Sequence, residues 1–202
     1  MQTTKIKSAY KDNYIDAARI RNRITTAAIL DNPAIFDFLL DDKETAEIAL
    51  EAMLNQNPHF WTDCICYISD NNKKGYQFVV DFFKKKYSYA AEVVSYVNKF
   101  TYGKESPVMN AFINDIMSEK LIDFSYKNQA LPVTFFYVYV ARIYNNIQMQ
   151  NYAINKLLRM KNYRYFVTMY KQVQKYLQED IRQLFKQKYV NSEAKCVLDI
   201  IN

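Results

Sequence analysis

Apolar side chains recur along most of the chain at steps of three and four residues, the spacing that gathers them on one face of an α-helix. Between residues 14 and 30, for example, Ile20, Ile24 and Ala27 share such a face. Similar stripes follow over residues 33–40, 42–54, 58–68, 76–83, 88–97 and 107–117. The pattern therefore predicts an all-α protein.

The four prolines all stand where a helix is expected to begin, because proline is tolerated in the first helical turn. In three of the four cases the preceding residue is a good N-cap, namely Asn32, Asn57 and Ser106. The fourth is Pro132, behind Leu131. The prolines are spaced by 25, 49 and 25 residues, which fits either a helical repeat or chance.

The segment 132–150 differs from the others because residues 133–144 are apolar on nearly every side. A helix of this kind belongs in the centre of a bundle. The run from Val133 to Val140 also has high β propensity. We interpret it as a helix, since proline opens it and no partner strand is evident in the sequence.

Toward the C-terminus, the pattern predicts a helix over residues 152–160 and a long one over about 163–189. The stripe of the long helix runs from Phe166 through Tyr170 and Leu177 to Leu184. Ser192 is expected to cap a last short helix. No Gly-, Ser- or Pro-rich linker divides the chain, so we expect residues 1–202 to form a single-domain bundle of roughly ten helices, with residues 1–12 as a polar N-terminal arm.

The composition excludes several classes of protein. Two glycines among 202 residues are too few for a Gly-rich nucleotide loop, and a single histidine excludes a multi-histidine metal site. Residue types with AT-rich codons dominate, which indicates an AT-biased genome such as that of a phage, a large DNA virus, a small-genome bacterium or some protozoa. The apolar runs are shorter than the roughly 20 residues of a membrane span, so we expect no membrane partner.

Charge is distributed unevenly along the chain, whose net charge is +6. Residues 124–178 contain no Asp or Glu but eight Lys and Arg, whereas residues 31–51 carry seven acids against one Lys. The candidate contacts to nucleic acid or an acidic partner are Lys156, Arg159, Lys161, Arg164, Lys171 and Lys175. The candidate acidic partner face comprises Asp37, Asp41, Asp42, Glu44, Glu47 and Glu51.

Three interpretations of this asymmetry compete. The acidic and basic regions of neighbouring copies could meet head to tail, which builds rings or filaments. The basic stretch, interleaved with tyrosines, could instead bind nucleic acid without sequence specificity. In the third interpretation the two regions are ordinary solvated faces of one fold.

Catalytic chemistry has little support in the sequence. His59 shows no acidic or nucleophilic partner at a diagnostic spacing, and the acids around Asp41 lack the glycine and spacing of a calcium loop. The cysteines Cys64, Cys66 and Cys196 are an odd number and form no metal-binding pattern, so we interpret them as small buried apolar residues. We therefore expect no catalytic residues, no metal and no cofactor.

These observations favour a non-enzymatic structural protein, a helical subunit of a larger assembly with other protein subunits as partners. A phage or viral particle component, such as a neck or connector ring, is the concrete form of this hypothesis. A nucleic-acid-binding replication or regulatory protein is one alternative, and a viral host-modulating protein that binds a partner helix is another. We expect it in the cytoplasm of the producing cell or in the virion.

Overall fold

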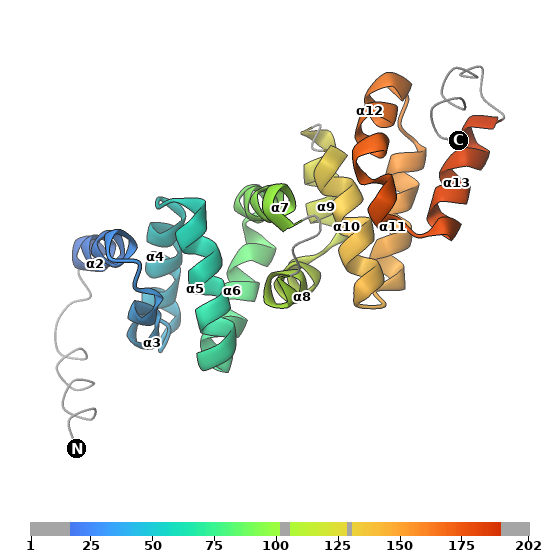
Figure 1. Ribbon diagram of the computed structural model, residues 1–202. Coiled ribbons are helices and arrows are strands. Elements are labelled where there is room, and N and C mark those ends of the chain that lie inside the picture. The colour runs from blue at the N-terminus through green and yellow to red at the C-terminus, as the bar shows by residue number, and fades with distance from the viewer. Residues whose placement is uncertain (1–16, 102–105, 129–130, 191–202) are drawn as a thin grey trace. The chain divides into compact units, whose positions relative to one another are not determined.

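The computed structural model describes residues 17–101, 106–128 and 131–190, which hold twelve α-helices, two short 3₁₀ helices and no strand (Figure 1). The prediction of an all-α protein is confirmed, with slightly more helices than expected. The N-terminal arm and the helix after Ser192 lie outside the described residues. The chain divides into two compact units, unit 1 up to Lys85 and unit 2 from Lys86 onward. The expectation of one domain stays a prediction.

Unit 1 contains five α-helices and a short 3₁₀ helix among its described residues. They are α2 (Ala17–Ile29), η1 (Pro33–Ile35), α3 (Phe36–Leu39), α4 (Lys43–Leu54), α5 (Pro58–Asn71) and α6 (Lys73–Lys85). Helix α4 packs against α2 and α6, and α5 packs against α6 and η1. The predicted stripes form the core, with Ile24, Ala49 and Cys64 fully buried.

Side-chain caps fix where the helices of unit 1 begin. Asn57 Oδ1 accepts the backbone N–H of Phe60 at 2.9 Å at the start of α5, and Asn32 Oδ1 accepts that of Ala34 at 3.2 Å at the start of η1. The two Asn-Pro segments thus begin elements of very different length, 14 and 3 residues. Element η1 runs directly into α3, and whether the proline spacing marks a repeat stays open.

Gly75 is buried in α6 at a point where the chain leaves no room for a side chain. A Cβ here would lie 2.8 Å from Leu40 Cδ1 and 2.9 Å from the side chain of Asn72, whose Oδ1 accepts the Gly75 N–H at 2.8 Å. Gly75→Val should therefore displace both neighbours and lower the free energy of unfolding by about 2 kcal/mol in urea denaturation. Gln77→Val, on the exposed face of α6, is the control, and an equal loss there would contradict the steric argument.

Unit 2 contains seven α-helices and a second 3₁₀ helix among its described residues. They are α7 (Tyr87–Thr101), α8 (Pro107–Ile116), α9 (Glu119–Lys127), α10 (Leu131–Ile143), α11 (Ile147–Leu158), α12 (Tyr163–Val173), η2 (Gln174–Tyr176) and α13 (Glu179–Val190). Helix α10 packs against α7, α8, α9, α11 and α12. The prediction of a central helix in this region is confirmed, and its β-favouring residues are helical because all-round burial outweighs local propensity.

The central helix ends earlier than predicted, at Ile143 instead of near residue 150. Asn145 adopts a left-handed conformation with φ of 54°, and the N–H of Asn146 donates to the carbonyl of Ala141 at 2.8 Å. This hydrogen bond is the Schellman pattern that closes a helix C-terminus. The chain reverses there, and α11 runs beside α10 (Figure 1).

The prediction of one long helix over residues 163–189 is wrong. Helix α12 ends at Val173, and after η2 the backbone of Leu177 is extended, with φ of −88° and ψ of 141°. The ring of Phe185 lies 5.4 Å from that of Phe166, whereas a straight helix would separate these residues by about 28 Å. Helix α13 therefore folds back, because this buries Phe185 among Phe135, Phe166 and Tyr170. We call these four residues the aromatic cluster.

Candidate functional site

Part of the predicted acidic face is an exposed stripe along one helix. Glu44, Glu47 and Glu51 recur at three- and four-residue steps and are all exposed on α4, and we call them the acidic stripe. Like charges at this spacing repel one another mildly, so the stripe favours a cationic partner.

Two of the three aspartates of the predicted face use their carboxylates within unit 1, and the third, Asp41, contributes only its backbone carbonyl. Asp37 Oδ2 accepts the Tyr67 hydroxyl at 2.8 Å, a hydrogen bond that raises the pKa of Tyr67. Asp42 caps α4 and accepts both the N–H of Thr45 at 3.0 Å and its hydroxyl at 2.6 Å. The backbone carbonyl of Asp41 accepts Lys74 Nζ at 2.9 Å.

The basic residues predicted as contacts do not gather at one place. Lys171 and Lys175 are exposed at the end of α12 and in η2, with exposed Gln172 between them, and we call this pair the basic face. The ammonium of Lys175 lies 4.8 Å from the ring centroid of Tyr176. Arg159 and Lys161 are exposed beyond the other end of α12, about 15 Å away along the helix axis. The side chain of Arg164 lies outside the described residues.

Lys156 is committed to a contact inside unit 2, which corrects its assignment as a partner contact. Its ammonium lies 2.6 Å from Asp123 Oδ1, which also accepts the Tyr152 hydroxyl at 3.0 Å. Burial raises the pKa of the Asp123 carboxyl, but hydrogen bonds from Lys156 and Tyr152 outweigh it and keep that pKa below its usual value. Asp123 immediately precedes residues 124–178, which contain no Asp or Glu. It neutralises the charge of Lys156 across the contact between α9 and α11.

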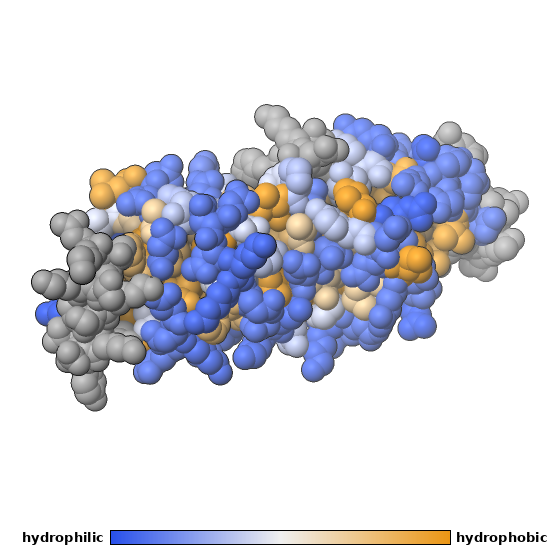
Figure 2. Space-filling view, turned by 90° about the horizontal axis from the view of Figure 1, so that it is seen from below, coloured by the Kyte–Doolittle hydropathy of each residue, from blue (hydrophilic) through white to orange (hydrophobic). Residues whose placement is uncertain are grey.

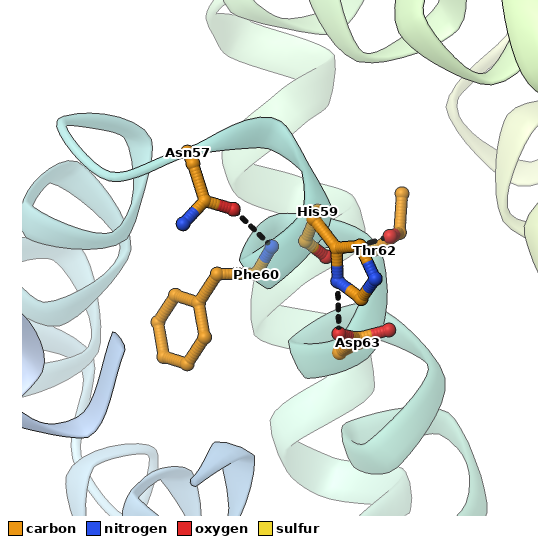
Figure 3. Close-up of polar contacts among 5 residues, drawn as sticks. All are labelled: Asn57, His59, Phe60, Thr62 and Asp63. Carbon is orange, nitrogen blue, oxygen red and sulfur yellow. Dashed lines mark hydrogen bonds and ion pairs between the residues drawn. The ribbon is translucent and has the colours of Figure 1, made fainter. Parts of the chain in front are cut away.

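His59 has acidic neighbours, contrary to the sequence analysis. Its Nδ1 lies 2.6 Å from Asp63 Oδ2, one turn further along α5 (Figure 3). In the same view, the Thr62 hydroxyl donates to the carbonyl of His59 at 2.7 Å. Asp31, in the turn after α2, completes a group whose ligand atoms all lie within 4.8 Å of one another. The four-residue spacing of His59 and Asp63 was visible in the sequence, whereas the position of Asp31 was not.

Large apolar side chains reach the surface at several separate points. In unit 1 these are Ile29, Leu30 and Phe38, which are 78%, 68% and 55% exposed. In unit 2, Ile143 and Ile147 flank the turn between α10 and α11 and are 50% and 62% exposed. On the face drawn in Figure 2, apolar surface likewise occurs in patches between hydrophilic areas. Exposed apolar residues of this size are typical of protein contacts when they cluster.

The described helices are all too short or too polar to cross a membrane. Comparison with known proteins gives no assignment, because no family model, curated protein or solved structure matches the chain. The class that the structure defines is an all-helical protein with an acidic stripe on one unit and a basic face on the other. Its function has to be argued from these surfaces.

Proposed function

We propose that the protein is a non-enzymatic assembly subunit whose copies associate head to tail through opposite charges. The observation that carries this proposal is the separation of charge between the two units. The acidic stripe lies on α4 of unit 1, and the basic face lies on α12 and η2 of unit 2. An interface between two different surfaces of identical copies closes into a ring or extends into a filament.

The two charged surfaces suit the roles of orientation and recognition. Charge complementarity steers partners together and fixes their register, while most of the affinity comes from apolar contact. The exposed apolar side chains of the α10–α11 turn, Ile143 and Ile147, belong to the same unit as the basic face. They supply surface whose burial would stabilise such a contact.

A component of a phage or viral particle, such as a neck or connector ring, is the finer form of this proposal. It is supported by the AT-biased residue usage of the chain, which concerns the source of the gene. Native mass spectrometry checks it directly, because a ring has one fixed copy number. In this form the protein acts in the cytoplasm of the producing cell and in the virion.

Nucleic-acid binding is the second candidate, favoured by the placement of Lys175 beside Tyr176. An exposed cation next to an aromatic ring can neutralise a phosphate while the ring stacks on a base. The two lysines of the basic face would then contact a nucleic acid in place of another subunit.

A charge-reversal experiment tests the head-to-tail contact. Lys171→Glu combined with Lys175→Glu should weaken self-association about 10- to 100-fold in sedimentation velocity, because like charges would then face each other. Adding Glu44→Lys and Glu47→Lys in the same chain should restore it. Wild-type association should also weaken as salt rises, since exposed charges are screened beyond about 10 Å at 0.1 M.

The matched control is Lys84→Glu combined with Lys85→Glu, which makes the same change of net charge at exposed positions of α6. This control should leave association intact. A wild-type chain that stays monomeric at both low and high salt would overturn the proposal. If association instead survives the reversal while binding to a DNA duplex is lost with a smaller salt slope, the basic face is a nucleic-acid interface.

A further inference from the structure

We infer that Asp31, His59 and Asp63 form a binding site for a divalent transition-metal ion in unit 1. The three side chains come from two segments, the turn after α2 and the first turns of α5, and their ligand atoms lie within 4.8 Å of one another. The inference concerns unit 1 alone and is independent of the proposed assembly function.

The fold fixes the backbone positions of all three residues. His59 and Asp63 are four residues apart on α5, so their side chains lie on one face of the helix. Asp31 adopts a left-handed conformation with φ of 50°, and the next N–H, that of Asn32, donates to the carbonyl of Ala27 at 2.8 Å. This is a Schellman C-cap, in which glycine is the usual residue at the left-handed position. Here that position instead holds a carboxylate and presents it to α5.

The electrostatics of the cluster favour a cation. The carboxylates of Asp31 and Asp63 lie close together. His59 lies beside Asp63 and is positively charged only when it is protonated. The described part of the chain gives the Asp31 carboxylate no hydrogen bond and no ion pair. A divalent ion would neutralise both carboxylates at once.

The donor set indicates which ions suit the site. One imidazole nitrogen and two carboxylate oxygens match Zn²⁺ and similar first-row ions, which bind these ligands at about 2.0–2.2 Å. Ca²⁺ is disfavoured because it takes six to eight oxygen ligands. The His59 side chain is 71% exposed, so water can occupy the remaining coordination positions. A bound metal would replace the contact between His59 Nδ1 and Asp63 Oδ2.

Binding at this site would link the end of α2 to the start of α5. A ligand that binds only the folded state raises its stability, and here the link spans the contact between η1 and α5. Zinc at about ten times its dissociation constant should therefore raise the melting temperature of the full chain by about 3–6 °C.

Titration of the tag-free full chain with Zn²⁺, followed by NMR, tests the site. His59 is the one histidine in the sequence, so its imidazole signals report on this position without overlap from other histidines. Cys66→Ser and Cys196→Ser in the background remove competing thiols. Zinc should shift the imidazole signals, and Asp31→Asn and Asp63→Asn should each weaken binding by about tenfold or more.

The matched control is Asp70→Asn, which removes an exposed carboxylate two turns beyond Asp63 on the same helix. It should leave zinc affinity unchanged. Imidazole signals that do not respond to zinc would overturn the proposal. An Asp31→Asn variant that binds zinc as tightly as the parent would overturn it as well, because the metal would then rest on the helical His–Asp pair alone.

Discussion

Replacing Phe185 by Ala is expected to lower the free energy of unfolding of unit 2 by about 3–5 kcal/mol, the usual cost of deleting a buried aromatic ring. Phe185 is fully buried, and its ring lies 5.4–6.0 Å from those of Phe166, Phe135 and Tyr170. The variant leaves a cavity where α13 packs against the rings of Phe135, Phe166 and Tyr170. Urea denaturation followed by circular dichroism measures the loss, which is large beside the 5–15 kcal/mol of a typical protein.

Leu184→Ala is the matched control for this prediction. Leu184 is 44% exposed, so its truncation should cost less than about 1 kcal/mol. A continuous helix over residues 163–189 would reverse the order, because its apolar stripe runs through Leu184. A larger loss for Leu184→Ala than for Phe185→Ala would therefore contradict the break between α12 and α13.

The protein should lose stability as the pH rises above about 9, and the buried Cys64 thiol should contribute to this loss. Burial, and then the charges of Asp63 and Asp31, raise the pKa of its thiol in the folded state above the ordinary 9.0. As the pH rises, the unfolded chain releases the thiol proton first, so each further pH unit favours unfolding by about 1.4 kcal/mol. Tyr137 acts in the same direction above its ordinary pKa of 10.0, because burial raises its pKa too.

Denaturation curves between pH 8 and pH 11 measure this effect. Cys64→Ala should show a flatter dependence of unfolding free energy on pH, whatever its stability at pH 8. Parallel slopes for wild type and Cys64→Ala would show that this thiol ionises equally easily in both states.

Sequence patterns predicted the helices well wherever local spacing decides the outcome. The central position of α10 follows from apolar residues on every side, and its burial against five other helices confirms it. The break at Leu177 carries no proline or glycine as a signal. It arises because folding α13 back buries Phe185, a contact across the fold that spacing along the chain does not encode. Helix α9 was missed because its stripe of Leu121, Ile122 and Ser125 is short.

The candidate surfaces show the same division between local and distant contacts. Glu44, Glu47 and Glu51 share a face because they follow helical spacing, so their exposure could be predicted. Lys156 could not be assigned correctly, because Asp123 pairs with it from 33 residues earlier in the chain. The same limit explains Asp31, whose approach to His59 depends on the left-handed turn after α2.

The aromatic cluster joins residues 50 positions apart, from Phe135 to Phe185, and this sets an order of events during synthesis. Unit 1 is complete in sequence at Lys85, whereas the cluster of unit 2 cannot close until Phe185 has been added. At about 5–20 residues per second, the ribosome takes about 5–20 s to make the 100 residues between these points. Helix α10 is complete at Ile143, 42 residues before Phe185, so for about 2–8 s of that interval its apolar surface lacks α13 to cover it. A chaperone that shields this surface during synthesis would limit aggregation.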